Sequence, residues 1–190
     1  MSKALKNTVA IIIIIFISIG LGYVYEQVTV HFGKKAHPLM YEEIVEKYAH
    51  EYGVPKEIIY SVINTESNFK SDAVSPRGAV GLMQIMPDTF EWISGKMGEI
   101  TSDGLLYDPY TNIKYGTFYL RYLFDRFNSW DIAFAAYNAG PTRISSWLDN
   151  PEYIKDNKVV YIPIEETRNY LKRVNKNIEN YKKLYFDKEK

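Results

Sequence analysis

The sequence contains no cysteine among its 190 residues. It therefore has no disulfide framework, no thiol nucleophile, no cysteine-ligated metal and no cysteine to carry a lipid anchor. Histidine is scarce, and His31, His37 and His50 do not form the H-E-x-x-H pattern of zinc hydrolases. The G-x-S-x-G pattern of serine hydrolases does not occur either. We therefore expect no metal and no cofactor.

The sequence also lacks net charge, because 23 basic residues balance 23 acidic ones. Residues 26–190 carry 21 basic and 23 acidic side chains, so we expect no nucleic acid partner. Residues 155–190 have a modest basic excess, with 10 basic and 6 acidic side chains. Such an excess is compatible with contact to an anionic surface, but a solvated helix face is the interpretation we favour.

One apolar run stands out near the start of the chain, from Val9 to Val24. Residues 8–25 would form a helix about 27 Å long at 1.5 Å per residue, just enough for a hydrocarbon core of about 30 Å. Lys3 and Lys6 precede the run, so the positive-inside rule places the rest of the chain outside. We predict an uncleaved single-pass anchor of the cytoplasmic membrane over residues 1–25. A cleaved signal peptide is the alternative.

The remaining sequence predicts a mainly α-helical domain over residues 41–185, joined to the anchor by a linker over residues 26–40 and followed by a polar tail over residues 186–190. Apolar residues recur at helical spacing, and proline, glycine and asparagine interrupt the pattern. Residues 69–81 and 98–109 are predicted loops, and Pro163 makes residues 159–164 an extended segment. The predicted helices cover residues 41–51, 56–66, 87–96, 112–127, 130–138, 142–148 and 165–185.

Four short segments carry side chains suited to chemistry. Glu66-Ser67 ends an apolar helix, where partial burial would raise the pKa of a carboxyl group and suit it to proton transfer. Residues 78–87 combine glycines with Gln84, whose amide both donates and accepts hydrogen bonds. Residues 136–140 place Tyr137 and Asn138 at a helix end, and residues 162–170 include Glu166, Arg168 and Tyr170. Taken singly, each segment also fits an exposed acid, a turn, a helix stop or a structural ion pair.

Together and in this order, the four segments resemble the motif set of the SLT domain of lytic transglycosylases, glycoside hydrolase family 23. They read Glu66-Ser67, Gly81-Leu82-Met83-Gln84-Ile85-Met86-Pro87, Ala136-Tyr137-Asn138-Ala139-Gly140 and Glu166-Thr167-Arg168-x-Tyr170. The resemblance implies a lysozyme-like helical fold and makes Glu66 the catalytic acid and base. It implies a structural role for Glu166 and Arg168, and it implies substrate contacts for Ser75, Met83, Gln84, Tyr137, Asn138 and Tyr170.

The resemblance also implies the reaction and the partners. The substrate is peptidoglycan, cut at the β-1,4 bond between N-acetylmuramic acid and N-acetylglucosamine with formation of a 1,6-anhydromuramic acid end. If Asp72 reached the cleft as a second carboxylate, a hydrolytic muramidase would be the alternative. A non-catalytic cell-wall binding or scaffold protein is a further alternative. The membrane is the expected second partner, through the N-terminal helix, and the sequence identifies no protein partner.

Overall fold

The computed structural model describes residues 2–99 and 102–187, and for residues 4, 6, 9, 10 and 103 it describes the backbone alone. The chain divides into two compact parts, Met1–Pro38 and Leu39–Lys190, which we describe separately. The last three residues of the predicted polar tail, 188–190, lie outside the described residues.

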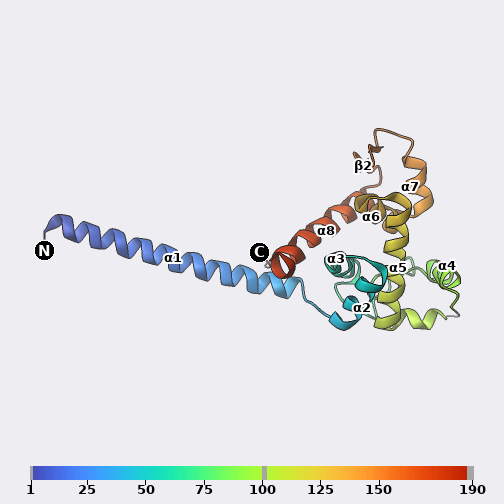
Figure 1. Ribbon diagram of the computed structural model, residues 1–190, viewed down its shortest axis with the longest axis horizontal. Helices are drawn as coiled ribbons and strands as arrows, with labels where there is room; N and C mark the ends of the chain where they lie inside the picture. Colours follow the sequence, from blue (N-terminus) through green and yellow to red (C-terminus); the bar gives the residue numbers. More distant parts are fainter. Residues whose placement is uncertain (1, 100–101, 188–190) are drawn as a thin grey trace. The chain divides into compact units, whose positions relative to one another are not determined.

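The first part is one long helix, α1 (Lys3–Ala36) (Figure 1). Its apolar side chains are exposed along residues 11–25. Among the described residues, it is the only helix long and apolar enough to cross a membrane. Its 34 residues span about 51 Å, more than the hydrocarbon core requires. The helix includes residues 26–36, where the sequence predicts a linker. The helix continues to Ala36 because no proline occurs before Pro38. It ends at Ala36 because His37 precedes that proline, and the residue before a proline disfavours helical geometry.

The second part is mainly helical, as the sequence predicts. Each predicted helix is present with ends that differ by a few residues, and predicted loop 98–109 includes a short 3₁₀ helix, η1. The elements in chain order are α2 (Glu42–Tyr52), α3 (Lys56–Ser67), α4 (Pro87–Met97), η1 (Asp103–Tyr107), α5 (Pro109–Phe127), α6 (Trp130–Ala139), α7 (Pro141–Trp147), β1 (Ile154–Lys155), β2 (Lys158–Val159), α8 (Glu165–Tyr181) and the π-helical turn η2 (Lys182–Phe186).

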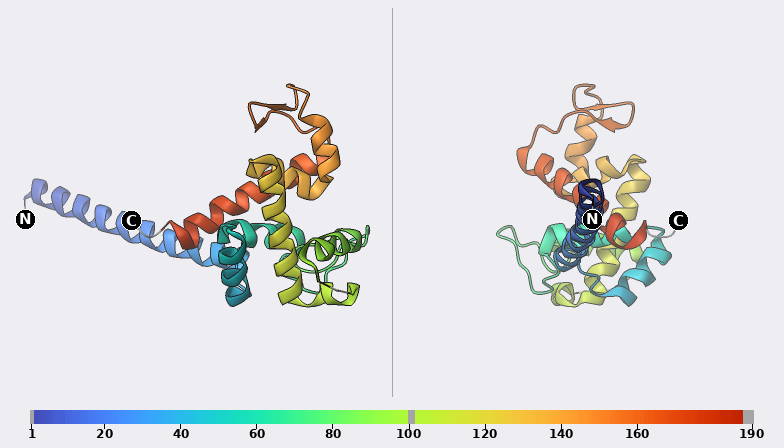
Figure 2. Two further views of the ribbon diagram at one scale, coloured as in Figure 1. Left: turned by 45° about the vertical axis from the view of Figure 1, so that its right-hand side comes forward. Right: turned by 90° about the vertical axis from the view of Figure 1, so that its left-hand side faces the viewer.

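The core lies where α3 packs along α8 and where α5 packs against α2 and α6. Helix α5 stands between α2 and α3 on one side and α4 on the other (Figures 1 and 2). The apolar face predicted for α3 is the face that is buried, because Ile58, Ile59, Val62 and Ile63 are each at most 5% exposed. Each such side chain contributes about 1.5–3 kcal/mol of hydrophobic stabilisation. This packing makes α3 a rigid support for the residues at its C-terminal end.

The extended segment expected over residues 159–164 begins at the second strand of a small antiparallel hairpin, and residues 160–164 form no strand. Strand β2 pairs with β1, with Ile154 opposite Val159. Asp156 and Asn157 make the two-residue turn, with φ angles of 50° and 57°. Asp and Asn tolerate this left-handed conformation better than other side-chain-bearing residues. Each strand has only two residues, so neither shows the alternation that would have predicted it.

Candidate active site

Glu66 lies in the last turn of α3, and the helix ends one residue later, at Ser67. Asn68 and Phe69 both adopt left-handed backbone conformations, with φ angles of 49° and 64°. The hydroxyl of Ser67 donates to the carbonyl oxygen of Leu82 at 2.7 Å and also contacts that of Ile63 at 3.2 Å. Ser67 therefore ties the end of the helix to the segment that contains Gln84, and this bond fixes the position of Glu66 relative to that segment.

The segment between α3 and α4, residues 68–86, folds into a compact wall beside Glu66. Val80 forms isolated antiparallel bridges with Val74 and Ile85. The wall is held from behind by Asn112 of α5, which is completely buried. The Asn112 amide donates to the carbonyl oxygens of Val80 and Leu106 at 2.9 and 2.8 Å, and its oxygen accepts from the backbone N–H of Met83 at 2.7 Å. One side chain thus satisfies three buried backbone groups that would otherwise be costly to bury.

Two glycines allow this close packing. Gly81 has a φ of 80°, and a Cβ atom there would overlap the Asn112 amide and lie 2.5 Å from the Leu106 carbonyl oxygen. A Cβ atom on Gly116 of α5 would overlap the side chain of Met83. The glycines therefore permit α5 to approach residues 81–83 more closely than any side chain would allow.

A cavity of about 510 Å³ opens between this wall, α6 and the start of α8. Four of its ten lining residues are polar and neutral, three are apolar, and the charged ones are Glu66, Arg77 and Glu166. Arg77 and Glu166 form an ion pair of 3.2 Å with both side chains largely exposed. The complete lining is Glu66, Ser75, Pro76, Arg77, Ala79, Gln84, Met86, Tyr137, Asn138 and Glu166.

Burial raises the pKa of the Glu66 carboxyl from its ordinary value of 4.5 to about 7, because loss of water disfavours the charged form. The Tyr170 hydroxyl and the positive charge of Arg173 oppose this rise in pKa, and the negative charge of Glu166 adds to it. The Tyr170 hydroxyl, which is itself buried, lowers the pKa of the Glu66 carboxyl more than Arg173 does. Glu66 is therefore partly protonated at neutral pH.

The hydrogen bonds inside the wall determine what the polar lining can offer a ligand. The Gln84 amide nitrogen donates to the carbonyl oxygens of Ala73 and Gly81 at 3.0 and 2.9 Å, which leaves its oxygen as an acceptor. The Ser75 hydroxyl accepts from the Ala79 N–H at 2.9 Å and keeps its own proton to donate. Asn138 uses its oxygen to accept from Thr167 at 2.7 Å, so its N–H groups remain to donate.

The structure brings four of the six predicted substrate-binding residues into the cavity with Glu66, namely Ser75, Gln84, Tyr137 and Asn138. Met83 does not reach it, because its side chain is fully buried against Gly116, and only its carbonyl oxygen serves the site by accepting from the Tyr137 hydroxyl at 2.7 Å. The Met83 side chain therefore does not line the cavity, and its substrate contact stays a prediction. Tyr170 is also buried and lies behind Glu66 rather than in the cavity lining.

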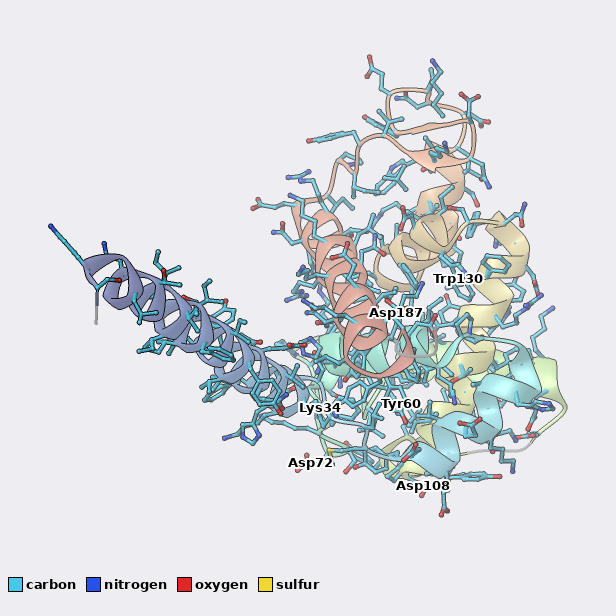
Figure 3. All side chains as sticks on the ribbon, turned by 60° about the vertical axis from the view of Figure 1, so that its left-hand side comes forward. Lys34, Tyr60, Asp72, Asp108, Trp130 and Asp187 are labelled. Atoms are coloured by element: carbon cyan, nitrogen blue, oxygen red, sulfur yellow. The ribbon has the colours of Figure 1, made fainter. Side chains whose placement is uncertain are left out.

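Glu166 and Arg168 do not pair with each other. Arg168 instead donates to the carbonyl oxygen of Ile162 at 2.6 Å, while Glu166 lines the cavity and pairs with Arg77. Arg77 was not among the predicted site residues, and the available signal was its place in the Ser-Pro-Arg-Gly turn beside Ser75. Asp72 is exposed, does not line the cavity, and lies at the outer edge of the domain in Figure 3.

The site thus defines a class of protein. It is a helical domain with a polar cavity, one partly protonated carboxyl group at a helix end, and neutral donors and acceptors around it. Such a site is suited to general acid catalysis on a substrate rich in hydroxyl and amide groups.

Comparison with known proteins gives the family. Residues 43–160 match the sequence model of the transglycosylase SLT domain, so the chain belongs to this family. The soluble lytic murein transglycosylase of Escherichia coli K12 is 41% identical over 143 residues, which cover 72% of this chain and 22% of that protein. The membrane-bound lytic murein transglycosylase C of Haemophilus influenzae PittGG is 33% identical over 162 residues, covering 72% of this chain and 45% of that protein.

Solved structures agree with this assignment. The 70-kDa soluble lytic transglycosylase of Escherichia coli superposes with a TM-score of 0.73 at 35% identity, over 80% of this chain and 25% of that one. An inactive glutamate-to-glutamine variant of the lytic transglycosylase Slt of Pseudomonas aeruginosa gives a TM-score of 0.70 at 34% identity, over 79% and 25% of the two chains. The chain therefore has the fold of these enzymes but spans only about a quarter of the length of the soluble relatives.

Proposed function

We propose that this protein is a membrane-anchored peptidoglycan lytic transglycosylase. It cleaves the β-1,4 bond between N-acetylmuramic acid and N-acetylglucosamine and leaves a 1,6-anhydromuramic acid end. The observation that carries the proposal is the partly buried Glu66, with a pKa of about 7, in a cavity that also holds four neutral polar side chains. Lytic murein transglycosylases among the relatives of this chain support the same reaction.

Glu66 acts first as an acid. Its proton passes to the glycosidic oxygen while the bond from that oxygen to C1 of the muramic acid breaks. The carbonyl oxygen of the 2-acetamido group of the same sugar forms a bond to C1 and carries the positive charge as an oxazolinium ion. A pKa near 7 suits this step, because the acid is protonated in a large fraction of molecules at neutral pH and is still strong enough to donate.

Glu66 then acts as a base. Its carboxylate takes the proton of the C6 hydroxyl, whose oxygen bonds to C1 as the bond from C1 to the acetamido oxygen breaks. Glu66 is protonated again and no water is consumed. The nucleophile belongs to the substrate, so the cavity needs only to position it, and effective molarities of order 10⁵ M have been reached by well-oriented intramolecular groups.

The neutral lining residues position the sugar in this proposal. The Gln84 oxygen accepts from a donor such as the acetamido N–H, because both of its own N–H groups are already engaged. The N–H groups of Asn138 and the hydroxyl of Ser75 donate to sugar oxygens near the scissile bond. Tyr137 offers a ring as well as a hydroxyl, and a ring can pack on the apolar face of a sugar.

A hydrolytic muramidase is the second candidate, and one observation favours it. Glu166 provides a second carboxylate in the cavity lining, a better position for activating water than that of the exposed Asp72. It forms an exposed ion pair with Arg77. We favour the transglycosylase because the closing hydroxyl is already part of the bound sugar and needs no second carboxylate.

Mass spectrometry of the muropeptides released by the full chain in mild detergent distinguishes the two reactions. Products with 1,6-anhydromuramic ends, lighter by one water, are the expected result, and reducing-end muramic acid would identify a muramidase. Glu66→Gln is expected to abolish release, in line with the inactive glutamate-to-glutamine variant of the Pseudomonas relative. Asp72→Asn is the matched control and is expected to keep full activity.

The location in the cell is part of the proposal. Helix α1 crosses the cytoplasmic membrane once, with residues 1–25 as the uncleaved anchor and the catalytic domain outside. The absence of cysteine permits a direct test with single introduced cysteines and a membrane-impermeant maleimide on intact spheroplasts. Glu152→Cys is expected to react and Ser2→Cys to react only after lysis. The opposite pattern would refute the orientation, and an intact mass without the first residues would indicate a cleaved signal peptide.

A further inference from the structure

The cavity at Glu66 does not end at Asn138. It shares four lining residues with a second hollow of about 240 Å³, namely Gln84, Met86, Tyr137 and Asn138. The second hollow shares Thr89, Tyr119 and Pro141 with a third hollow of about 380 Å³. The three hollows therefore form one continuous groove. Its distal end, the third hollow, is bounded by α4, α5 and the start of α7, and Figure 1 shows α4 and α7 on the same side of α5.

The distal end is formed by aromatic rings that the proposed chemistry does not use. Trp92 of α4 lines it together with Tyr119 and Tyr122 of α5. The ring of Trp92 meets those of Tyr122 and Tyr119 edge to face, with centroids 4.8 and 6.1 Å apart. The ring of Tyr119 in turn contacts the ring of Tyr137, with centroids 5.4 Å apart, so the row of rings extends back to the cavity at Glu66.

Trp92 is unusual because it is not part of the core. Its neighbours on α4, Phe90 and Ile93, are fully buried, whereas Trp92 remains 39% exposed. Within α4, the Trp92 ring is contacted by Lys96, whose ammonium group lies 5.6 Å from the ring centroid. An aromatic ring held in place by other rings, yet open to a groove, can pack on the apolar face of a sugar without a large loss of side-chain entropy.

The polar groups around these rings also fit a sugar. Asp88 at the start of α4 supplies acceptors and Arg126 of α5 supplies donors on the same hollow, so its charges balance. Arg126 is held by a 2.9 Å hydrogen bond to the Ser145 hydroxyl, which fixes the direction of its remaining N–H groups. Sugar hydroxyl groups both donate and accept, so a neutral saccharide can bond to both side chains.

We infer that Trp92 and Tyr122 form a distal sugar-binding platform for the same glycan strand that is cut at Glu66. The inference rests on the proposed function, because continuity with the Glu66 cavity is what assigns a glycan to the groove. Its consequence is that the protein distinguishes long strands from short fragments. A strand that reaches the platform is held at both ends of the groove, and a short fragment is held only at Glu66.

The first experiment compares peptide-free glycan strands with four-sugar fragments as substrates of the full chain in detergent. Trp92→Ala is expected to raise KM for long strands about tenfold, as the loss of one aromatic contact of roughly 1.4 kcal/mol would, and to leave kcat unchanged. The same variant is expected to leave the kinetics of short fragments unchanged. Trp92→Phe keeps a ring and should recover most of the affinity, and Tyr107→Ala, which removes an exposed aromatic residue that does not line the groove, is the matched control.

The second experiment measures binding without cleavage. In the full chain with Glu66→Gln, peptide-free strands are expected to change tryptophan emission, and adding Trp92→Phe should remove that change. Unchanged long-strand kinetics in Trp92→Ala, or equal losses on long and short substrates, would overturn the platform. A response only to strands that carry stem peptides would also overturn it, because the occupant would then be a peptide.

The two experiments separate this inference from the proposed reaction. If the wild-type chain releases no anhydro product, the proposed function fails, while the emission test with Glu66→Gln still decides whether the platform binds sugars. If wild-type cleavage is as proposed but strand length has no effect that depends on Trp92, only the platform is refuted.

Discussion

The pKa of Glu66 makes a prediction about stability that is independent of any substrate. A rise of the pKa from 4.5 to about 7 corresponds to about 3 kcal/mol that the folded state loses when the carboxyl ionises. The folded protein holds this proton more tightly than the unfolded chain does. The favourable contribution is therefore fully present below pH 4.5 and is lost as the pH rises through 7.

Glu66→Gln removes the ionisation but keeps the size and the hydrogen-bonding capacity of the side chain. At pH 4 the variant and the wild type are expected to have similar free energies of unfolding. At pH 8.5 the variant is expected to be more stable by up to about 3 kcal/mol. This figure is an upper value, because Glu66 is only partly buried and retains some contact with water.

The assay is urea unfolding of the full chain in nonionic detergent across this pH range, followed by tryptophan fluorescence. All three tryptophans, Trp92, Trp130 and Trp147, lie in the catalytic domain, so α1 does not contribute to the signal. Glu152→Gln, which removes an exposed carboxyl before β1, is the control and should change the free energy of unfolding by less than about 0.5 kcal/mol at any pH. A stability difference for Glu66→Gln that does not grow between pH 4 and pH 8.5 would refute the burial argument.

The groups around Glu66 give opposite predictions for the pH profile of kcat/KM. Glu166→Gln removes a negative charge that raises the pKa of Glu66, so the basic limb should move to lower pH, and no movement would show that the carboxylates do not interact. Tyr170→Phe removes a group that lowers that pKa, so the basic limb should move to higher pH. Gly116→Ala should lower stability by about 1–3 kcal/mol, measured by the same urea unfolding, because its Cβ overlaps a buried methionine side chain. Gly95→Ala, where a Cβ meets nothing within 4 Å, is its control and should be neutral or stabilising, and equal effects of the two variants would contradict the packing argument.

The helices and the position of Glu66 were predictable because their causes are local. The apolar spacing of Ile58, Ile59, Val62 and Ile63 defines both the helix and its buried face, and it places Glu66 at the helix end. Proline and glycine mark most of the boundaries. The end of α1 was harder to predict, because residues 26–36 contain nothing that stops a helix, although they leave the purely apolar run.

The partners of the site residues were not predictable, because they depend on contacts between distant parts of the chain. Arg77 and Glu166 are 89 residues apart, and only the fold brings them together. Asn112 lies inside a helix with no motif around it, yet it satisfies two backbone groups of the wall beside Glu66 and the Leu106 carbonyl oxygen of η1. The motif containing Met83 was identified correctly, but the direction of each side chain within the turn was not. Met83 was expected in the cavity, whereas Gln84 and Met86 line it.

The residues predicted from local patterns and those brought in by distant contacts together explain how the site keeps an unfavourable carboxyl group in place. A carboxyl with a pKa near 7 is a cost to the folded state at neutral pH, so the surrounding structure must hold it against relaxation toward water. The left-handed residues Asn68 and Phe69 turn the chain back at the end of α3, and the bond from Ser67 to the Leu82 carbonyl fixes that turn to the wall. The wall is fixed in turn by Asn112. Glu66 therefore stays in the cavity because its neighbours are bonded to the backbone, which leaves its own carboxyl available for the substrate.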